Sequence, residues 1–340
     1  MSRDELRLAV CGATGVVGRE MIQILAQRKF PLAELRLLAS ERSGGERIEF
    51  GDDELTVEPL TEAALEGLDL ALFSAGGAVS ERFAPVAAAA GAVVIDNTSA
   101  FRMQPDVPLV VPEVNPEDLA GFAERRIVAN PNCSTIQLVL ALAPIAAAAG
   151  LRRVAVATYQ SVSGAGRSGV EELERQSIGV FNLKPLVAER FERQIAFNCL
   201  PCIDRFMDDG YTFEERKMID ETRKILHRPE LRVTATCVRV PVFYAHAEAV
   251  NVECERELGA AEARALLAES PGLRLMDDPA AGVYPTPIDA AGADETLVGR
   301  VRQDVSQDRG LELWLVADNV RKGAALNAVQ IAELLARDYL

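Results

Sequence analysis

The chain has 340 residues, of which 49% are hydrophobic and 26% are charged, and its formal net charge is −15. This length suits a globular protein with two hydrophobic cores. The acidic balance excludes the broad basic surface of a nucleic-acid-binding protein, and it requires local Arg and Lys side chains for any anionic ligand.

The ends and the cysteines indicate the compartment. Residues 1–10 mix charges and lead directly into a strand pattern, so we expect no signal peptide. The longest apolar run, residues 138–151, contains Pro144 and is too short to span a bilayer. Six scattered cysteines do not form a disulfide scaffold. These features predict a cytoplasmic protein without a membrane partner.

The chain opens with a strand over residues 6–10, a glycine-rich turn and a helix. Glycines in such a turn let the backbone approach a pyrophosphate at the helix N-terminus. The spacing here is G-x-x-G-x-x-G, a variant of the usual dinucleotide-binding motif. The turn residues expected to contact the cofactor are Gly12, Thr14, Gly15, Val16, Val17 and Gly18.

The second strand, residues 35–38, ends where a nucleotide-binding fold contacts the adenosine ribose. An acidic side chain there favours NAD, and Glu41 is available. An Arg favours the 2′-phosphate of NADP, and Arg42 is flanked by the hydroxyl groups of Ser40 and Ser43. The balance of these residues predicts NADP.

The alternation of strand and helix continues after the second strand. Further strands are expected over residues 68–73, 92–95 and 126–129, and a helix over residues 80–90. Alternating strands and helices predict a parallel, doubly wound sheet of the Rossmann type. Ligands of such sheets bind beyond the carboxyl ends of the strands, where Ser74 and Gly76 follow one strand. Arg102 follows another and is a candidate anion clamp.

Residues 129–135, Ala-Asn-Pro-Asn-Cys-Ser-Thr, precede a long apolar run from Ile136. The pattern predicts a core helix with Asn132 as its N-cap and Cys133 in its first turn. Unpaired N–H groups and the helix dipole at that position favour a thiolate, hence a nucleophile. A buried structural cysteine is the alternative on this segment alone.

The second half is richer in strands. After a strand over residues 154–159 and a polar glycine loop, several strands follow one another, which predicts a mixed sheet in an α+β domain. The expected helices cover residues 170–176, 213–226 and 320–340, and the expected strands cover residues 232–241, 247–255, 296–302 and 311–316. We expect a nucleotide-binding domain of residues 1–131, completed by residues 320–340, and a second domain of residues 132–319.

Cys199 and Cys202 form a C-x-x-C pair, which is compatible with half of a zinc site or with a redox couple. No second pair with metal spacing follows, and the chain has only two histidines, His227 and His246. The sequence therefore favours a structural role for the pair, and no metal is expected.

Six segments together resemble the aspartate-β-semialdehyde dehydrogenase family, and the resemblance covers essentially the whole chain. The segments are residues 12–18, 39–43, 130–135, 160–166, 239–246 and 318–330. One departure is Tyr244-Ala245-His246-Ala247, where family members often have Asn-Gly-His-Ser. The resemblance implies a homodimer, in some members a tetramer, with a catalytic and dimerisation domain beside the nucleotide-binding domain.

The resemblance also implies the reaction. The family reduces L-aspartyl-4-phosphate to L-aspartate-4-semialdehyde with NADPH, through a cysteine thioester and with release of phosphate. The product supplies the synthesis of lysine and diaminopimelate, threonine, methionine and isoleucine. The implied catalytic residues are Cys133 as nucleophile, His246 as general acid/base and Gln160, which orients the carbonyl.

The remaining site residues follow from the same resemblance. Arg239 binds the substrate α-carboxylate, and Glu221 meets its amino group. Arg102, Lys224 and Asn132 form the phosphate site. Ser40, Arg42 and Ser43 hold the 2′-phosphate, while Asn319 and Gln330 approach the nicotinamide end. Further cofactor contacts are expected from Ser74, Gly76, Ser163 and Gly164.

Two alternatives are weighed against this function. The sister activity on N-acetyl-glutamyl phosphate has an acylated amine, beside which an acidic partner such as Glu221 is misplaced. A non-catalytic NADP-binding sensor on the same fold is the other, since a fold does not fix a function. Cys133, Gln160 and His246 argue against the sensor.

Overall fold

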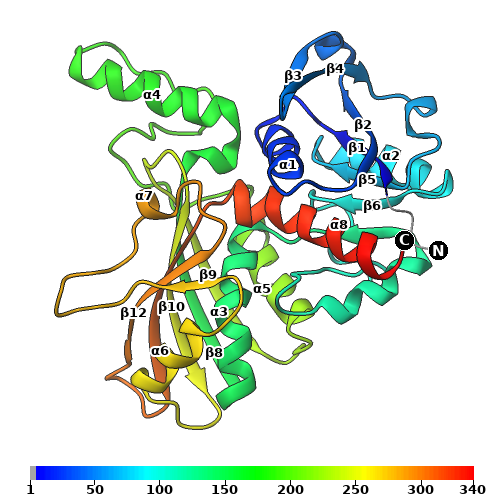
Figure 1. The fold of residues 1–340 in the computed structure, drawn as a ribbon. Coiled ribbons are helices and arrows are strands. Elements are labelled where there is room, and N and C mark those ends of the chain that lie inside the picture. Colours follow the sequence, from blue (N-terminus) through cyan, green and yellow to red (C-terminus); the bar gives the residue numbers. More distant parts are fainter. Residues whose placement is uncertain (1–4) are drawn as a thin grey trace. The chain divides into compact units, whose positions relative to one another are not determined.

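A computed structural model describes residues 5–340, and Met1–Asp4 at the mixed-charge start lie outside the described residues. The chain divides into two compact units. The first unit runs to Asn132 and includes Ala324–Leu340, and the second unit is Cys133–Gly323. Figure 1 shows the ribbon, with the C-terminal helix α8 (Leu326–Asp338) in red.

The first unit contains a seven-stranded sheet with the order β3-β4-β2-β1-β5-β6-β7. Its strands are β1 (Leu6–Cys11), β2 (Leu32–Ala39), β3 (Arg47–Phe50), β4 (Asp53–Pro59), β5 (Leu70–Phe73), β6 (Val93–Asp96) and β7 (Ile127–Ala129). All neighbours pair in parallel except β3 with β4. The doubly wound prediction is confirmed, while the β3–β4 hairpin at its edge was not expected.

Helices α1 (Val16–Gln27) and α2 (Gly77–Ala89) belong to this unit, in which α1 packs against α8 and α2 packs along β5–β7. The short elements are η1 (Glu41–Ser43), η2 (Ala63–Leu65) and η3 (Pro116–Glu124). One apolar core joins β1, α1 and α8, so residues from both ends of the chain share it. Burial of a common core explains why the unit closes with the last helix.

The glycine-rich turn between β1 and α1 is constrained at both ends. Gly12 has a φ of +95°, which favours glycine. A Cβ on Gly18 would lie 2.2 Å from the Gly12 carbonyl oxygen. Only glycine at position 18 therefore lets α1 pack this closely against the turn.

The second unit contains a six-stranded mixed sheet with the order β11-β12-β13-β10-β8-β9. Its strands are β8 (Leu151–Gln160), β9 (Arg232–Arg239), β10 (His246–Cys254), β11 (Leu273–Leu275), β12 (Thr296–Gln303) and β13 (Gly310–Ala317). The β8–β9 and β11–β12 pairs are parallel, and the others are antiparallel. The prediction of a mixed sheet in the second half is confirmed.

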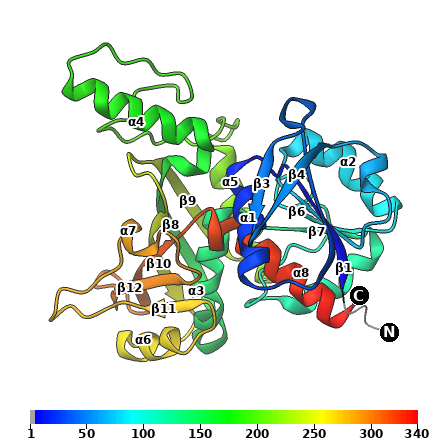
Figure 2. The same ribbon diagram turned by 45° about the horizontal axis from the view of Figure 1, so that its top comes forward.

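Helix α3 (Cys133–Ala149) packs across β8, β10, β12 and β13, and α5 (Phe213–Ile225) packs against β9. Figure 2 shows α3 alongside the sheet. The other helical elements are α4 (Arg167–Phe181), α6 (Ala260–Ala268), α7 (Pro287–Ala290), η4 (Val162–Ala165) and the π-helical η5 (Arg321–Ala325). Residues 134–142 of α3 are all buried, as expected for a helix that is predominantly apolar.

The register of this sheet brings four strand ends together. Gln160 at the end of β8 pairs with Arg239 at the end of β9. His246 at the start of β10 pairs with Ala317 at the end of β13. Because β10 runs antiparallel to β8 and β13, its first residue lies beside their last ones. The polar residues that follow these strands therefore collect at one edge of the sheet.

Residues 320–340 were expected to form one helix, but η5 and α8 are distinct elements and the unit boundary falls between Gly323 and Ala324. A Cβ on Gly323 would lie 2.9 Å from the Cβ of Cys133. Glycine thus permits the close approach of η5 to the start of α3.

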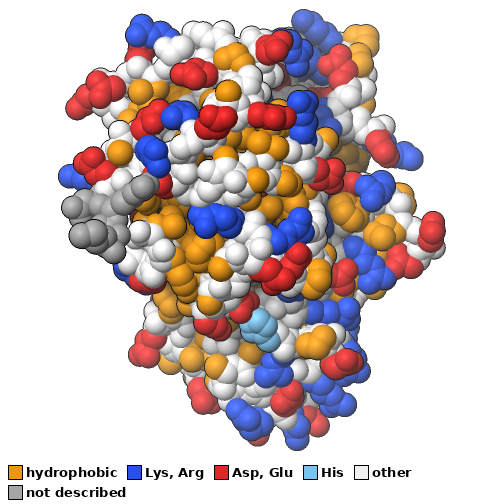
Figure 3. All heavy atoms as spheres, turned by 90° about the vertical axis from the view of Figure 1, so that its right-hand side faces the viewer, with side chains coloured by type: hydrophobic (Ala, Val, Ile, Leu, Met, Phe, Trp, Pro, Cys, Tyr) orange, Lys and Arg blue, Asp and Glu red, His pale blue; other side chains and the backbone are white. Residues whose placement is uncertain are grey.

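Acidic and basic side chains are interspersed over the face shown in Figure 3, although the net charge is −15. No described helix combines the length and apolar character that a bilayer crossing requires.

Candidate active site

Cys133 is the first residue of α3, and it is half-buried, whereas the residues that flank it are buried. The first turn of a helix has N–H groups without intrahelical partners. These groups and the dipole stabilise negative charge, so the position suits a thiolate nucleophile. Placement in the first turn was predicted from the sequence and is confirmed.

His246 is fully buried at the start of β10. Its Nδ1 accepts a hydrogen bond from the Ser161 backbone N–H at 3.0 Å and lies 3.0 Å from the Ser161 hydroxyl oxygen. Its Nε2 is buried and has no hydrogen-bond partner. Burial, reinforced by the positive charge of Arg239, lowers the pKa of His246 to about 3. The imidazole is therefore neutral at working pH.

Asn319 holds the loop before His246 in place. Its Oδ1 accepts hydrogen bonds from the Ser161 and Ser163 hydroxyl groups at 3.1 and 3.0 Å, and from the Ala245 N–H at 3.1 Å. Ala245 has a φ of +67°, where an L-residue costs roughly 1–2 kcal/mol. The hydrogen bond that Ala245 donates to Asn319 thus supports a strained residue next to the imidazole. Sequence reasoning gave Asn319 a cofactor role and missed this one.

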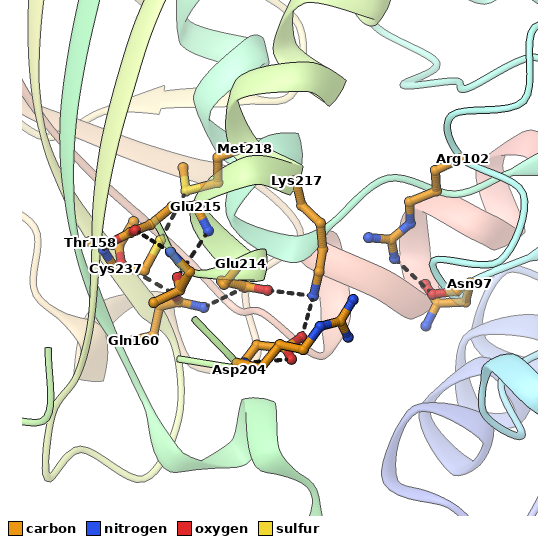
Figure 4. A network of polar contacts seen from close by, with 12 residues as sticks. Asn97, Arg102, Thr158, Gln160, Asp204, Glu214, Glu215, Lys217, Met218 and Cys237 are labelled. Carbon is orange, nitrogen blue, oxygen red and sulfur yellow. Dashed lines mark hydrogen bonds and ion pairs between the residues drawn. The ribbon is translucent and has the colours of Figure 1, made fainter. Parts of the chain in front are cut away.

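Gln160 lies in a buried polar network with residues of α5 (Figure 4). The Gln160 amide donates to Glu214 Oε1 at 3.1 Å, and the Thr158 hydroxyl donates to Gln160 Oε1 at 3.1 Å. Lys217 Nζ donates to Glu214 Oε2 at 2.8 Å and to Asp204 Oδ2 at 3.2 Å. The network fixes the amide orientation of Gln160 and places the Glu214 carboxylate beside it, and the Lys217 ammonium contacts that carboxylate in turn.

The expected pair Glu221 and Lys224 lies further along α5, and the observed contact to Gln160 belongs to Glu214 instead. The E-x-x-K spacing occurs twice in this helix, seven residues apart. Seven residues are close to two helical turns, so both copies lie on nearly the same face. Periodicity alone cannot separate them, and only the tertiary contact does. Glu221 is buried.

Arg239 is buried at the end of β9, and its Nη1 donates to the Ser161 carbonyl oxygen at 2.7 Å. Its backbone exchanges two hydrogen bonds with Leu200, each 2.9 Å long. Burial lowers the pKa of Arg239. A Cβ on Gly164 would lie 2.9 Å from Arg239 Nη1 and 3.1 Å from His246 Nε2. The guanidinium and the imidazole therefore both border Gly164.

The first unit carries the features expected of a dinucleotide site. Helix α1 follows Gly15, with no side-chain cap and no acidic residue in its first turn. Helix α2 follows Gly76 in the same way. Both N-termini therefore keep amides for an anionic ligand. Ser40 and Arg42 are exposed and Ser43 is half-buried, beside the end of β2.

Three further predicted residues also lie in the first unit. Arg102 is buried and donates to the carbonyl oxygens of Asn130 and Asn97, each at 2.9 Å (Figure 4). Asn132 is buried. Gln330, on α8, donates to Glu113 at 3.0 Å.

Comparisons with known proteins agree with the geometry. A family model described as "semialdehyde dehydrogenase, NAD binding domain" matches residues 7–122, and one described as "semialdehyde dehydrogenase, dimerisation domain" matches residues 142–322. Aspartate-semialdehyde dehydrogenase of Aquifex aeolicus is 54% identical over 98% of this chain and 99% of its own length. The chain belongs to the aspartate-semialdehyde dehydrogenase family.

Other members support this assignment. Aspartate-semialdehyde dehydrogenase 2 of Vibrio cholerae is 54% identical, with 99% of each chain covered. The crystal structure of aspartate semialdehyde dehydrogenase II from Vibrio cholerae matches with a TM-score of 0.97 at 53% identity, covering 99% of this chain and 100% of that chain. The resemblance seen in the sequence is confirmed, and the chain is an oxidoreductase with a nucleotide-binding domain.

The two cysteines of the C-x-x-C pair, Cys199 and Cys202, differ in exposure. Cys199 is exposed, and Cys202 is half-buried with its thiol donating to the Asp204 carbonyl oxygen at 3.3 Å. Burial raises the pKa of the Cys202 thiol, which makes it a poorer nucleophile and metal ligand at neutral pH. None of the six cysteines, all of which lie within the described residues, forms a disulfide.

Glu248 is a buried acid that sequence reasoning missed. It follows His246 by two residues on β10 and is fully buried, as is Gln137 of α3. Neither carboxylate oxygen has a partner within hydrogen-bond distance. Burial raises the pKa of Glu248 to about 8, and only the Gln137 amide opposes this shift. Glu248 therefore holds a proton in the folded protein at neutral pH.

We expect Glu248→Gln to change how stability depends on pH. The folded carboxyl releases its proton near its pKa of about 8, and the unfolded one near the ordinary value of 4.5. Since the folded state binds more protons in this window, wild-type stability falls relative to the variant as pH rises, by about 1.4 kcal/mol per pH unit.

Urea unfolding of both proteins between about pH 5 and pH 8 measures this difference. The lowered pKa of His246 acts in the opposite direction below pH 6.5, but it is common to both proteins and cancels in the comparison. Parallel stability curves would contradict a protonated Glu248.

Proposed function

We propose that this chain catalyses the NADPH-dependent reductive dephosphorylation of L-aspartyl-4-phosphate to L-aspartate-4-semialdehyde. The observation that carries the proposal is the half-buried Cys133 at the start of α3, in the unit that also contains buried His246 and Arg239. Support comes from the Vibrio cholerae relative, whose 53%-identical structure is described as complexed with ASA.

In the proposed reaction the Cys133 thiolate attacks the acyl carbon, the carbon–phosphate oxygen bond breaks, and a thioester remains. When bound, NADPH supplies the hydride that reduces this carbon. The tetrahedral oxyanion then expels the Cys133 thiolate and leaves the aldehyde. A covalent intermediate divides a difficult reduction into two easier steps. Gln160 orients the carbonyl, and His246 faces its oxygen.

The substrate assignment rests on the charges around Gln160. Arg239 suits the α-carboxylate, because a planar guanidinium binds a carboxylate through two parallel hydrogen bonds. Glu214, at 3.1 Å from the Gln160 amide, suits the free α-ammonium of aspartate. An acylated amine, as in N-acetyl-glutamyl phosphate, offers no positive charge to that carboxylate, so aspartate is favoured.

The remaining assignments stay proposals. Arg102 and Asn132 keep the phosphate role that the resemblance gives them, and Lys217 replaces Lys224 because it pairs with Glu214. The match to a dimerisation domain supports a homodimer, with a tetramer as an alternative. The product would supply the synthesis of lysine and diaminopimelate, threonine, methionine and isoleucine.

NADP is the proposed cofactor. The residues that would hold it are the glycine turn, the amides at the starts of α1 and α2, and the segment with Ser40, Arg42 and Ser43. The tight Gly12–Gly18 packing and the two uncapped helices fit a pyrophosphate. Arg42 lies in the short helix η1, in which Glu41 is the acidic residue, and its guanidinium fits a 2′-phosphate.

We expect Cys133→Ala to reduce turnover by roughly ten-thousand-fold or more, the scale seen when a covalent nucleophile is deleted. Phosphate-dependent NADP⁺ reduction with aspartate semialdehyde measures this, with N-acetylglutamate semialdehyde offered in parallel. Cys199→Ala, an exposed thiol, is the matched control and should retain activity. Absence of turnover in the wild-type chain would favour the sensor, retained turnover in Cys133→Ala would refute Cys133 as the nucleophile, and preference for the acetylated substrate would favour the sister activity.

Glu214→Gln should raise KM for aspartate semialdehyde by about 10- to 100-fold, since a charge-assisted hydrogen bond contributes about 1.5–3 kcal/mol. The neutral amide keeps the shape of the side chain but loses the attraction for the substrate ammonium. The same substitution at Glu221 decides between the two copies of the motif. A larger increase at Glu221 than at Glu214 would return the role to Glu221.

Arg42→Ala should raise KM for NADP⁺ by about 10- to 100-fold and leave KM for NAD⁺ nearly unchanged, because only NADP⁺ carries the 2′-phosphate. Arg47→Ala on β3, an exposed Arg paired with Glu54 at 3.1 Å, controls for general loss of positive charge. Equal effects of Arg42→Ala on both cofactors would refute the 2′-phosphate assignment.

A further inference from the structure

We infer that Ser161 is a positioning residue whose backbone N–H holds His246 as the Nε2–H tautomer, so that His246 acts as a fixed hydrogen-bond donor to the reacting carbonyl oxygen. This inference rests on the proposed function for the identity of that oxygen. It concerns the proton on the imidazole, which can be observed without substrate.

The tautomer follows from a donor that has no alternative. A backbone N–H can only donate, and that of Ser161 lies 3.0 Å from His246 Nδ1. Nδ1 must therefore present its lone pair, and the proton of a neutral imidazole resides on Nε2. A proton on Nδ1 would point at the Ser161 N–H, so that two donors would face each other. The buried Ser161 amide would then have no acceptor, which costs about 1–3 kcal/mol.

The Ser161 hydroxyl does not reverse this choice. It lies 3.0 Å from Nδ1, 2.9 Å from the Ser163 hydroxyl and 3.1 Å from Asn319 Oδ1, to which it donates. It could accept a hydrogen bond from Nδ1–H, but only if the backbone N–H lost its acceptor. Both groups of Ser161 lie 3.0 Å from the same nitrogen. The hydroxyl can donate or accept, whereas the amide can only donate, so the amide determines the tautomer.

The charges around the imidazole disfavour a second proton. The positive charge of Arg239, at the end of β9, lowers the pKa of the imidazole, and the negative charge of Glu214, on α5, raises it. Glu248 lies two residues after His246 on β10. The charge of Cys133, on α3, favours the charged form of Arg239. Glu214 and the backbone of Ala245 favour the imidazolium, and burial and Arg239 outweigh them. The imidazole thus has a proton at Nε2 and none at Nδ1.

Nε2 is available for a substrate. It is buried without a hydrogen-bond partner. A Cβ on residue 164 would lie only 3.1 Å from it, so glycine at that position keeps the space beside Nε2 open. A buried N–H without a partner costs free energy, which a ligand oxygen would recover. The Nε2–H group therefore suits an oxygen that gains negative charge.

The proton balance of the thioester cycle agrees with a donor that keeps its proton. A thiolate attacks, phosphate leaves, hydride reaches the carbon, and the resulting oxyanion expels the thiolate. No step at the carbon requires His246 to give up or take a proton. The general acid/base role expected from the resemblance is thereby narrowed to stabilisation of the oxyanion, as a preorganised donor does.

The direct test is NMR of the enzyme with nitrogen isotope labels in its histidine rings. The chain has only two histidines, and exposed His227 can be replaced by Gln, so the remaining signal belongs to His246. We expect a protonated Nε2 and an unprotonated Nδ1, unchanged between about pH 5 and pH 9. A proton on Nδ1, or titration within this range, would overturn the inference whatever the substrate proves to be.

Two variants at position 161 separate the amide from the hydroxyl. Ser161→Ala keeps the N–H, and we expect the same tautomer. Replacing that residue by lactic acid, introduced by nonsense suppression, changes only the N–H of the Ala variant to an ester oxygen, and we expect the Nε2–H preference to be lost. A switch in Ser161→Ala, or no change in the ester, would overturn the role of the amide.

The donor role is tested by activity. The amide of Gln in His246→Gln reaches the region of Nε2 and can donate, whereas that of Asn in His246→Asn ends near Nδ1. We expect the Asn variant to lose about 10²- to 10³-fold in kcat, the effect of deleting one oxyanion donor, and the Gln variant to lose clearly less. Equal losses would overturn the donor role and leave the tautomer result intact.

Discussion

The register of the second sheet is the constraint on which the site depends. Gln160 pairs with Arg239, and His246 enters beside the end of β13, so four strand ends meet at one edge. A shift of one residue in any of these strands would turn the functional side chain to the opposite face. The buried core beneath α3 fixes the register, and the chemistry therefore depends on packing far along the strands.

A buried polar network then refines what the register places. Asn319 accepts three hydrogen bonds, two from serine hydroxyls and one from the strained Ala245. Buried polar groups are costly unless they are paired, and paired groups specify a single arrangement. The network leaves one ring nitrogen of His246 satisfied and the other available. Its value is specificity of orientation, for which the chain accepts a non-glycine residue at positive φ.

The sequence was informative where the relevant interaction is local. The glycine turn, the start of the helix at Cys133 and the parallel sheet follow from spacing within short windows. Residues joined only by tertiary contacts were missed or left ambiguous. Glu214 and Glu221 have the same spacing on one helix, and the Asn319 network joins segments more than seventy residues apart. The short β3–β4 hairpin at the sheet edge also has no strong pattern.

The neutral imidazole and the buried guanidinium depend on each other. Arg239 is desolvated and donates to the Ser161 carbonyl oxygen, while the adjacent N–H of the same residue donates to His246. A protonated His246 would place a second cation against Arg239 in a medium where like charges repel strongly. A neutral imidazole leaves the positive charge of Arg239 for an anionic substrate, which the net charge of −15 would otherwise repel. The N–H and the carbonyl oxygen of Ser161 thus contact the imidazole and the guanidinium respectively.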